Sequence, residues 1–293
     1  MKKLLILLPF LSVILATSLY ARTLHLVALG DTNEKKIGVA VQNNLQEMSN
    51  IFSHVAAACE ISFNQKLVIA ESLTHARAVA ELTNLPVKKD DILIVYYAGH
   101  GARKKRTPTI WPIGFANKNP DFNHLFFSEI IDHAVSKNAA LSIILLDCCN
   151  KYTSEPITNL MTQAIPQSME EDTLKVLQEL FFNRYGVIVA SAAAPWNATY
   201  CGMRGNSGPI SFFTSSFLTN FSHAMLVPNY SWRSILEATK LECQRMNTLL
   251  PQLPQYKIFL YTKRKSPELY KKSLDQRCRY KSRTRANRLA KMQ

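Results

Sequence analysis

Short, continuously apolar runs separated by longer amphipathic stretches constrain the fold of this chain more than any other feature. The clearest runs are ILIVYY at residues 92–97 and LSIILL at residues 141–146. A strand that is apolar at every position is buried on both faces, as in a parallel sheet that helices cover on both sides. The chain is therefore expected to adopt an α/β fold.

Strand and helix patterns alternate along most of the chain. Strands are expected at residues 24–29, 67–70, 92–97, 142–146, 187–190 and 256–261. Helices are expected at residues 38–58, 74–82, 126–135, 174–182, 212–221 and 232–246. Successive βαβ units predict a mainly parallel six-stranded sheet with helices on both faces. A chain of this length can form it as one large domain.

The first 21 residues have the pattern of a secretory signal peptide. Two lysines precede an apolar stretch from Leu4 to Leu15, and small residues lead up to Ala21. The stretch is too short, and too interrupted by Pro9, to span a membrane. The sequence therefore predicts export to a periplasm or to the cell exterior, with no integral membrane segment after cleavage. An uncleaved membrane anchor is the alternative.

Positive charge is concentrated at the C-terminal end. The formal net charge is +14, and residues 263–291 contain twelve Lys and Arg but only two acidic residues. We interpret residues 263–293 as a solvated basic tail that follows a domain of residues 22–262. A weak contact between this tail and a polyanion is the alternative.

The six cysteines do not have the spacing of metal ligands. They lie at positions 59, 148, 149, 201, 243 and 278, so no CxxC pair is present, and the chain has no HExxH motif. No metal site is predicted, and most of these cysteines are expected to be free, buried thiols.

Polar residues follow two of the apolar runs where the expected strands end. His100 lies between two glycines in AGHG, and Cys148 and Cys149 lie in DCCN. In open α/β sheets, chemistry takes place just beyond the carboxyl ends of the strands. An imidazole there can accept the proton of a thiol, and the Gly101 N–H can bind an oxyanion. One cysteine is therefore a candidate nucleophile, with a buried structural role as the alternative.

These motifs resemble those of the caspase, metacaspase and paracaspase group of cysteine peptidases, over residues 24–262. YYAGHG is similar to the histidine turn of that group and LLDCCN to its nucleophile segment. The resemblance implies a caspase-like three-layer sandwich with catalytic His100 and Cys149. It also implies an oxyanion hole formed by the backbone amides of Gly101 and Cys149, and no metal or organic cofactor.

The resemblance further implies a substrate preference. The residue two positions before the nucleophile lines the substrate pocket of the family, and an aspartate there accompanies cleavage after Arg or Lys. That residue is Asp147 here, and Asp31 from the loop after the first strand would supply a second pocket acid. Carboxylates bind guanidinium and ammonium groups well. From the residues alone, Asp147 could instead accept a structural hydrogen bond and Asp31 could cap a helix or form a turn.

The expected function is an exported caspase-like, metacaspase-like cysteine endopeptidase that acts on peptides or proteins and cleaves after Arg or Lys. Calcium dependence is not expected, because Phe127 and Ser128 stand where calcium-binding metacaspases have paired aspartates. One alternative is a catalytically silent caspase-like domain that binds a peptide or protein partner. Another is an unrelated α/β binding protein that docks through its basic tail. The presence of both His100 and Cys149 favours the enzyme, and the sequence leaves the oligomeric state open.

Overall fold

The computed structural model describes residues 22–103, 109–115, 124–151, 171–204, 208–227, 230–246 and 252–274. The expected signal peptide, residues 1–21, and the part of the basic tail from residue 275 onward lie outside these ranges. Within these ranges, no helix is both long enough and apolar enough to cross a membrane.

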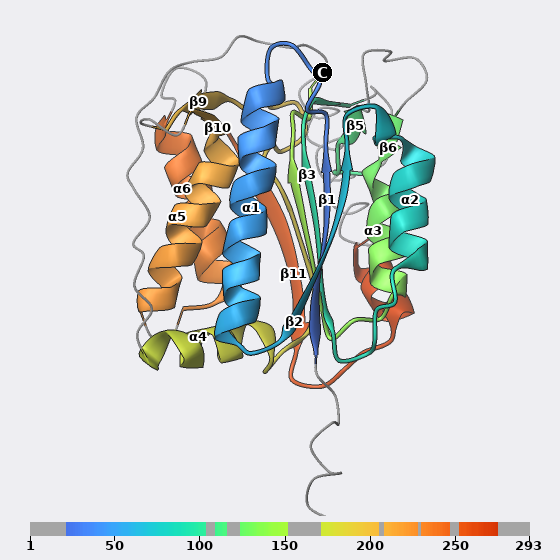
Figure 1. Cartoon of the computed structure of the whole chain (residues 1–293), viewed down its shortest axis with the longest axis vertical. Coiled ribbons are helices and arrows are strands. Elements are labelled where there is room, and N and C mark those ends of the chain that lie inside the picture. The colour runs from blue at the N-terminus through green and yellow to red at the C-terminus, as the bar shows by residue number, and fades with distance from the viewer. Residues whose placement is uncertain are drawn as a thin grey trace, which may run out of the picture.

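The centre of the fold is a six-stranded sheet with the strand order β11-β8-β7-β3-β1-β2 (Figure 1). The strands from β8 to β2 run parallel to one another, and β11 pairs antiparallel with β8. The predicted mainly parallel sheet is therefore confirmed. Its strands are β1 (Thr23–Gly30), β2 (Ser62–Ile69), β3 (Ile92–Ala98), β7 (Leu141–Asp147), β8 (Tyr185–Ser191) and β11 (Gln255–Tyr261).

Helices cover both faces of this sheet and complete a three-layer arrangement (Figure 1). One face carries α1 (Gly38–Ala58), α4 (Glu171–Phe181), α5 (Phe212–Leu226) and α6 (Trp232–Met246). The other face carries α2 (His75–Asn84) and α3 (Phe127–Ser136), and a short 3₁₀ turn, η2 (Ala70–Ser72), precedes α2. Successive strand side chains point to opposite faces. Ile143 and Leu145 therefore belong to the first core, and Ile144 and Leu146 to the second.

Two small sheets extend the structure beyond the carboxyl ends of the parallel strands, at the upper edge of Figure 1. One contains β4 (Gly101–Ala102), β5 (Ile113–Phe115) and β6 (His124–Phe126), and the other contains β9 (Cys201–Met203) and β10 (Pro209–Ser211). Strands this short show no alternation of apolar and polar residues. The periodicity of the sequence therefore does not reveal them.

Strand β2 begins earlier than predicted. The apolar pattern indicated residues 67–70, whereas the strand starts at Ser62. It is the edge strand of the sheet, and most of its side chains are partly or fully exposed, including the polar Asn64, Gln65 and Lys66. Even within the apolar run only Val68 is buried, and Leu67 is exposed.

The chain continues to pack against the domain after β11. Residues 267–274 form a helix, and its Tyr270 and Leu274 are buried in the second core. Lys257 of β11 donates a hydrogen bond from Nζ to the Leu274 carbonyl at 2.9 Å. The solvated tail that was expected from residue 263 therefore begins no earlier than residue 275, and the domain extends past the predicted boundary at residue 262.

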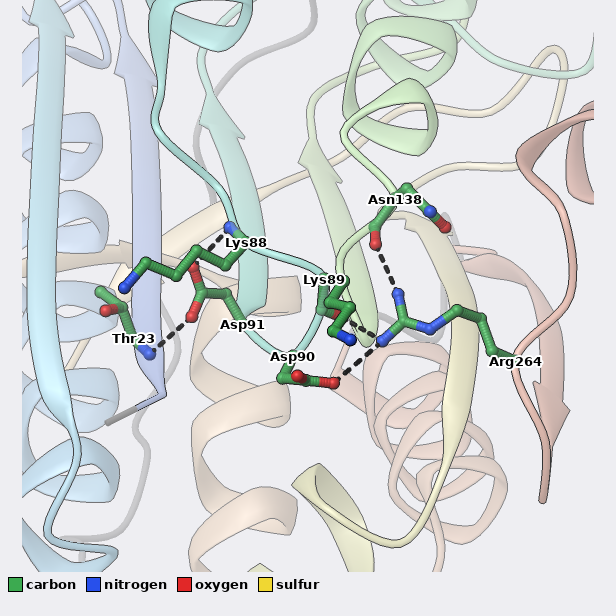
Figure 2. Close-up of polar contacts among 7 residues, drawn as sticks. All are labelled: Thr23, Lys88, Lys89, Asp90, Asp91, Asn138 and Arg264. Carbon is green, nitrogen blue, oxygen red and sulfur yellow. Dashed lines mark hydrogen bonds and ion pairs between the residues drawn. The ribbon is translucent and has the colours of Figure 1, made fainter. Parts of the chain in front are cut away.

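Arg264 fixes this C-terminal segment to the edge of the sheet where the parallel strands begin (Figure 2). Its guanidinium donates to the carbonyls of Asn138, at 2.8 Å, and Lys89, and it pairs with Asp90 Oδ1 at 3.2 Å. It also lies over the Tyr185 ring, 5.3 Å from the ring centroid. Arg264 is therefore a structural residue that joins the loops before β3 and β7 to the C-terminal segment.

Asp91 lies at the same edge and organises the starts of β1 and β3. Its carboxylate accepts hydrogen bonds from the Thr23 N–H at 2.9 Å and the Lys88 N–H at 2.7 Å, as Figure 2 shows. It also lies 3.0 Å from Nε2 of the buried His25. This network stabilises the amino ends of the strands, opposite the edge where His100 and Cys149 lie.

Removing the C-terminal segment is expected to destabilise the domain. A chain that ends at Thr262 loses the Arg264 contacts and the buried Tyr270 and Leu274. Burial of one large apolar side chain contributes roughly 1.5–3 kcal/mol, so thermal denaturation should show a melting temperature several degrees lower. A chain that ends at Leu274 keeps these contacts and is the matched control. Equal melting temperatures for the two truncated chains would contradict the expectation.

Candidate active site

His100 and Cys149 follow two neighbouring strands that are in register. Ala98, the last residue of β3, pairs with Asp147, the last residue of β7. The Gly99 N–H continues the pairing by donating to the Asp147 carbonyl at 3.2 Å. His100 and Cys149 each lie two residues beyond the Ala98–Asp147 pair, so the fold brings both predicted catalytic residues to the same edge of the sheet.

The turns that carry these two residues touch at Gly101. A side-chain carbon at this position would overlap the Cys149 carbonyl oxygen and would lie 2.6 Å from Cys148 Sγ. Only a glycine permits such a close approach of one backbone to another. The glycine after His100 is therefore needed for the two turns to meet.

The Gly101 N–H points away from the neighbouring strand β5. Gly101 pairs with Gly114, while the Phe115 N–H donates to the His100 carbonyl at 3.1 Å. In an antiparallel ladder this pattern makes Gly101 and Gly114 a pair without mutual hydrogen bonds. The Gly101 N–H therefore takes no part in the pairing with β5.

His100 is fixed through its backbone, and its ring lies near a carboxylate. The Tyr97 hydroxyl donates to the His100 carbonyl at 2.7 Å, in addition to the Phe115 N–H. His100 Nε2 lies 3.7 Å from Oε1 of Glu34, in the loop between β1 and α1. Glu34 was not predicted from the sequence, because nothing local relates a loop residue to a histidine so far along the chain.

The Cys149 thiol lies against Thr199, in the loop after β8. The Thr199 N–H donates to Sγ at 3.3 Å, and the Thr199 hydroxyl oxygen lies 3.4 Å from it. The loop is held by the Asn150 N–H, which donates to the Asn197 carbonyl at 2.9 Å, and by the Trp196 N–H, which donates to the Asn150 carbonyl at 2.8 Å. Backbone and hydroxyl donors are suited to a thiolate. Thr199 was not predicted either, because its role depends on this loop contact.

Cys148 points to the opposite face of the sheet. It is completely buried in the second core, whereas the partly exposed Cys149 packs against the first. Burial, together with the negative charge of Cys149 and Asp147, raises the pKa of the Cys148 thiol well above its ordinary value. The expectation that only one of the two adjacent thiols is available for chemistry is consistent with this placement.

The other described cysteines are also free; Cys243 is buried as expected, whereas Cys59 and Cys201 are only partly buried. Burial raises the pKa of Cys59 to about 11 and is the main cause that raises that of Cys201 to about 12. Burial also raises the pKa of Cys243 far above its ordinary value. A thiol with so high a pKa is a poor nucleophile at neutral pH. Cys278 lies outside the described residues.

Asp147 is buried, and four side chains donate to the same oxygen of its carboxylate. Oδ2 accepts from Ser211, from Thr214 at 2.6 Å, from Tyr96 at 3.3 Å and from Asn44 at 3.4 Å. Ser211 also caps α5 by accepting from the Thr214 N–H at 3.0 Å, so the carboxylate lies at the N-terminus of that helix.

Burial raises the pKa of Asp147 to about 6, although the hydrogen bonds from Ser211, Thr214 and Tyr96 act in the opposite direction. The carboxyl group is therefore mostly ionised at neutral pH and neutral in mild acid. Its partner Tyr96 belongs to the first core, against which Cys149 also packs. These contacts are compatible with both interpretations of Asp147, a pocket acid and a structural acceptor.

Asp31 is buried next to a different tyrosine. Burial is the main cause of the raised pKa of Tyr97, and the charges of Cys148 and Asp31 add to it. Tyr97 belongs to the second core, whereas the Tyr96 that donates to Asp147 belongs to the first. The two predicted pocket acids are thus associated with tyrosines whose rings lie on opposite faces of β3.

No cluster of three or more His, Cys, Asp and Glu side chains suited to a metal ion occurs within the described part of the chain. Phe127, at the position where calcium-binding metacaspases have an aspartate, is buried and packs on Tyr97 with ring centroids 4.8 Å apart.

The fold is a helix-covered, mainly parallel α/β sheet that carries a histidine and a cysteine just beyond the ends of two neighbouring strands. The family model described as the caspase domain matches residues 39–277, most of the chain. The chain therefore belongs to the caspase-domain family of cysteine peptidases, and its substrates are peptides or proteins. The match includes His100 and Cys149 and extends past residue 262, whereas Asp31 and Glu34 precede it. No curated protein matches the chain at a significant level.

Proposed function

We propose that the protein is a cysteine endopeptidase that uses Cys149 as its nucleophile and His100 as its general base and acid. The observation that carries this proposal is the register of β3 and β7, whose last residues, Ala98 and Asp147, form a pair. His100 and Cys149 each follow this pair by two residues. The close contact of Gly101 with the Cys149 segment supports the same assignment, because it brings the two turns together.

The reaction follows from this arrangement. His100 accepts the thiol proton, and Cys149 Sγ forms a bond to the carbonyl carbon of the scissile peptide. The N–H groups of Gly101 and Cys149 bind the carbonyl oxygen as it becomes negative. The C–N bond then breaks, and His100 returns the proton to the leaving amine. Water, deprotonated by His100, hydrolyses the resulting thioester and restores the free thiol.

We further propose that the peptidase cleaves after Arg or Lys, with Asp147 in the pocket for that side chain. The pKa of the Asp147 carboxyl group, about 6, leaves it mostly ionised at neutral pH. A charged carboxylate at the base of a desolvated pocket favours a cationic side chain. Asp31 as a second pocket acid remains a prediction from the resemblance.

Export and the polyanion contact are proposals that rest on the sequence alone. Export rests on the charge and hydropathy pattern of residues 1–21. The polyanion contact rests on the basic residues after Leu274, because Arg264 at the start of the basic segment is committed to the fold. Periplasmic or secreted localisation would follow from cleavage after Ala21.

A digest of a peptide library by a chain of residues 22–293 tests the proposed activity. Peptides should differ only in the residue before the scissile bond, with Arg, Lys, Asp and Leu compared. Cleavage is expected after Arg and Lys, with a preference of about thirtyfold or more over the others, the size of a charged contact in a desolvated pocket. Failure to cleave any peptide, together with no labelling of Cys149 by a peptidyl electrophile, would instead support a silent binding domain.

A further inference from the structure

We propose that Glu34 is a positioning residue that completes the catalytic group by holding the ring of His100. The inference rests on the proposed peptidase function and adds a third member to its two catalytic residues. Its structural basis is the pair formed by His100 Nε2 and Glu34 Oε1, which lie 3.7 Å apart.

The start of α1 fixes the carboxylate of Glu34. Its Oε2 accepts hydrogen bonds from the N–H groups of Lys36 at 2.6 Å and Ile37 at 2.7 Å. The Glu34 carbonyl also accepts from the N–H of Gly38, the first residue of the helix, at 2.8 Å. One carboxylate oxygen is thus held by the backbone, and the other is directed at the His100 ring.

The environment keeps Glu34 ionised. Burial acts to raise its pKa, but the N–H groups of Ile37 and Lys36, together with His100, lower it below its ordinary value. The side chains of His100 and Glu34 are 34% and 21% exposed, so water screens their interaction only in part. Tyr97, which donates to the His100 carbonyl, interacts electrostatically with Asp31, Cys148 and Cys149. The cationic side chains nearest in the sequence are Lys35 and Lys36, after Glu34, and Arg103, after His100.

This pairing assigns the two ring nitrogens of His100. With Nε2 facing Glu34, Nδ1 is the nitrogen that accepts the proton from Cys149 Sγ. The proton moves from sulfur to Nδ1, and Glu34 stays ionised and stabilises the imidazolium that results. A separation of 3.7 Å is that of an ion pair, so the effect of Glu34 is mainly electrostatic.

Glu34→Gln tests the proposal with little disturbance of the fold, because an amide oxygen can still accept from the Lys36 and Ile37 N–H groups. The first readout is the rate at which iodoacetamide alkylates Cys149, measured from about pH 5 to pH 9 on the chain of residues 22–293. Loss of one partly exposed ion pair should slow alkylation about three- to fivefold near pH 6 and leave it unchanged near pH 9. The acidic limb of the profile should move to higher pH.

The second readout is peptide hydrolysis, where kcat should fall and KM for the same peptide should stay constant. The matched control is Glu129→Gln, which removes the carboxylate of another histidine pair, His75 Nε2 and Glu129 Oε2 at 2.9 Å. An unchanged alkylation profile would overturn the proposal. So would a higher KM for Arg peptides at constant kcat, which would place Glu34 in the substrate pocket instead.

The alkylation measurement needs no substrate, so it separates this proposal from the proposed function. If the wild-type chain cleaves no peptide but Glu34→Gln still shifts the alkylation profile, the peptidase assignment fails while the role of Glu34 stands. If peptides are cleaved and the profile does not move, Glu34 has no positioning role.

Discussion

Replacing Cys149 with alanine is expected to lower peptide turnover by about a thousandfold or more, whereas Cys148→Ala should retain measurable activity. Loss of the nucleophile removes the covalent step, and residues that act as a unit lose nearly all catalysis together. Cys148 lies buried in the second core, where its raised pKa keeps the thiol protonated. Its truncation leaves only a small cavity, on the order of 1 kcal/mol of stability.

His100→Ala should reduce turnover as far as Cys149→Ala does, because the two residues act as a unit. Without His100 the Cys149 thiol has no base to accept its proton. Steady-state kinetics and mass spectrometry of the alkylated protein are the measurements. Cys243→Ala, which changes a buried thiol between α6 and α5, serves as a further control. Alkylation of Cys148 in the native protein, or wild-type turnover by Cys149→Ala, would reverse the assignment of the nucleophile.

The sheet and its covering helices could be predicted because most strands are buried on both faces and appear as apolar runs. The same rule fails for β2, an edge strand whose side chains are largely exposed. It also fails for residues 267–274, where frequent charges suggested a solvated tail. Ser266 followed by Pro267 is a local signal for a helix start, and Tyr270 and Leu274 are four residues apart on one face.

The candidate site was predictable where it depends on strand ends and not where it depends on loops. His100 and Cys149 follow apolar strands directly, so strand order alone places them at one edge. Glu34 and Thr199 reach the site through turns that carry no periodic pattern. Their contacts with His100 and Cys149 depend on how the loops after β1 and β8 fold back over the sheet, which only tertiary packing determines.

Asp147→Asn is expected to remove most of the preference for Arg and Lys before the scissile bond. Loss of a charged contact in a desolvated pocket lowers transition-state binding by roughly 2–5 kcal/mol, or about thirtyfold or more in kcat/KM. Peptides with an uncharged residue at that position should be cleaved equally by both enzymes. In the wild-type enzyme, kcat/KM for Arg peptides should also fall relative to that for Leu peptides as the pH decreases through about 6, where Asp147 becomes protonated.

Asp147→Asn should lower selectivity but should not lower the stability of the folded protein. The pKa of Asp147 rises from an ordinary 3.8 to about 6 in the folded state, so the folded protein binds this proton more tightly than the unfolded chain does. The stability contributed by this group is fully present below about pH 4 and is lost as the pH rises through about 6. A neutral asparagine avoids that loss. Asp147→Asn should therefore be at least as stable as the wild type at pH 7.5, by up to roughly 2–3 kcal/mol.

Asp91→Asn supplies the matched control, because Asp91 is a buried carboxylate at the opposite edge of the sheet, bonded to Thr23, His25 and Lys88. It should lower the melting temperature without changing selectivity. Asp147→Asn should change selectivity while preserving the melting temperature, as measured by the library digest and by denaturation from about pH 4 to pH 8. The contrary outcome is that Asp147→Asn lowers the melting temperature at pH 7.5 and slows the cleavage of Arg and Leu peptides equally. Asp147 would then be a purely structural residue that accepts hydrogen bonds from Ser211, Thr214, Tyr96 and Asn44. The preference for basic side chains would then have to come from another part of the site.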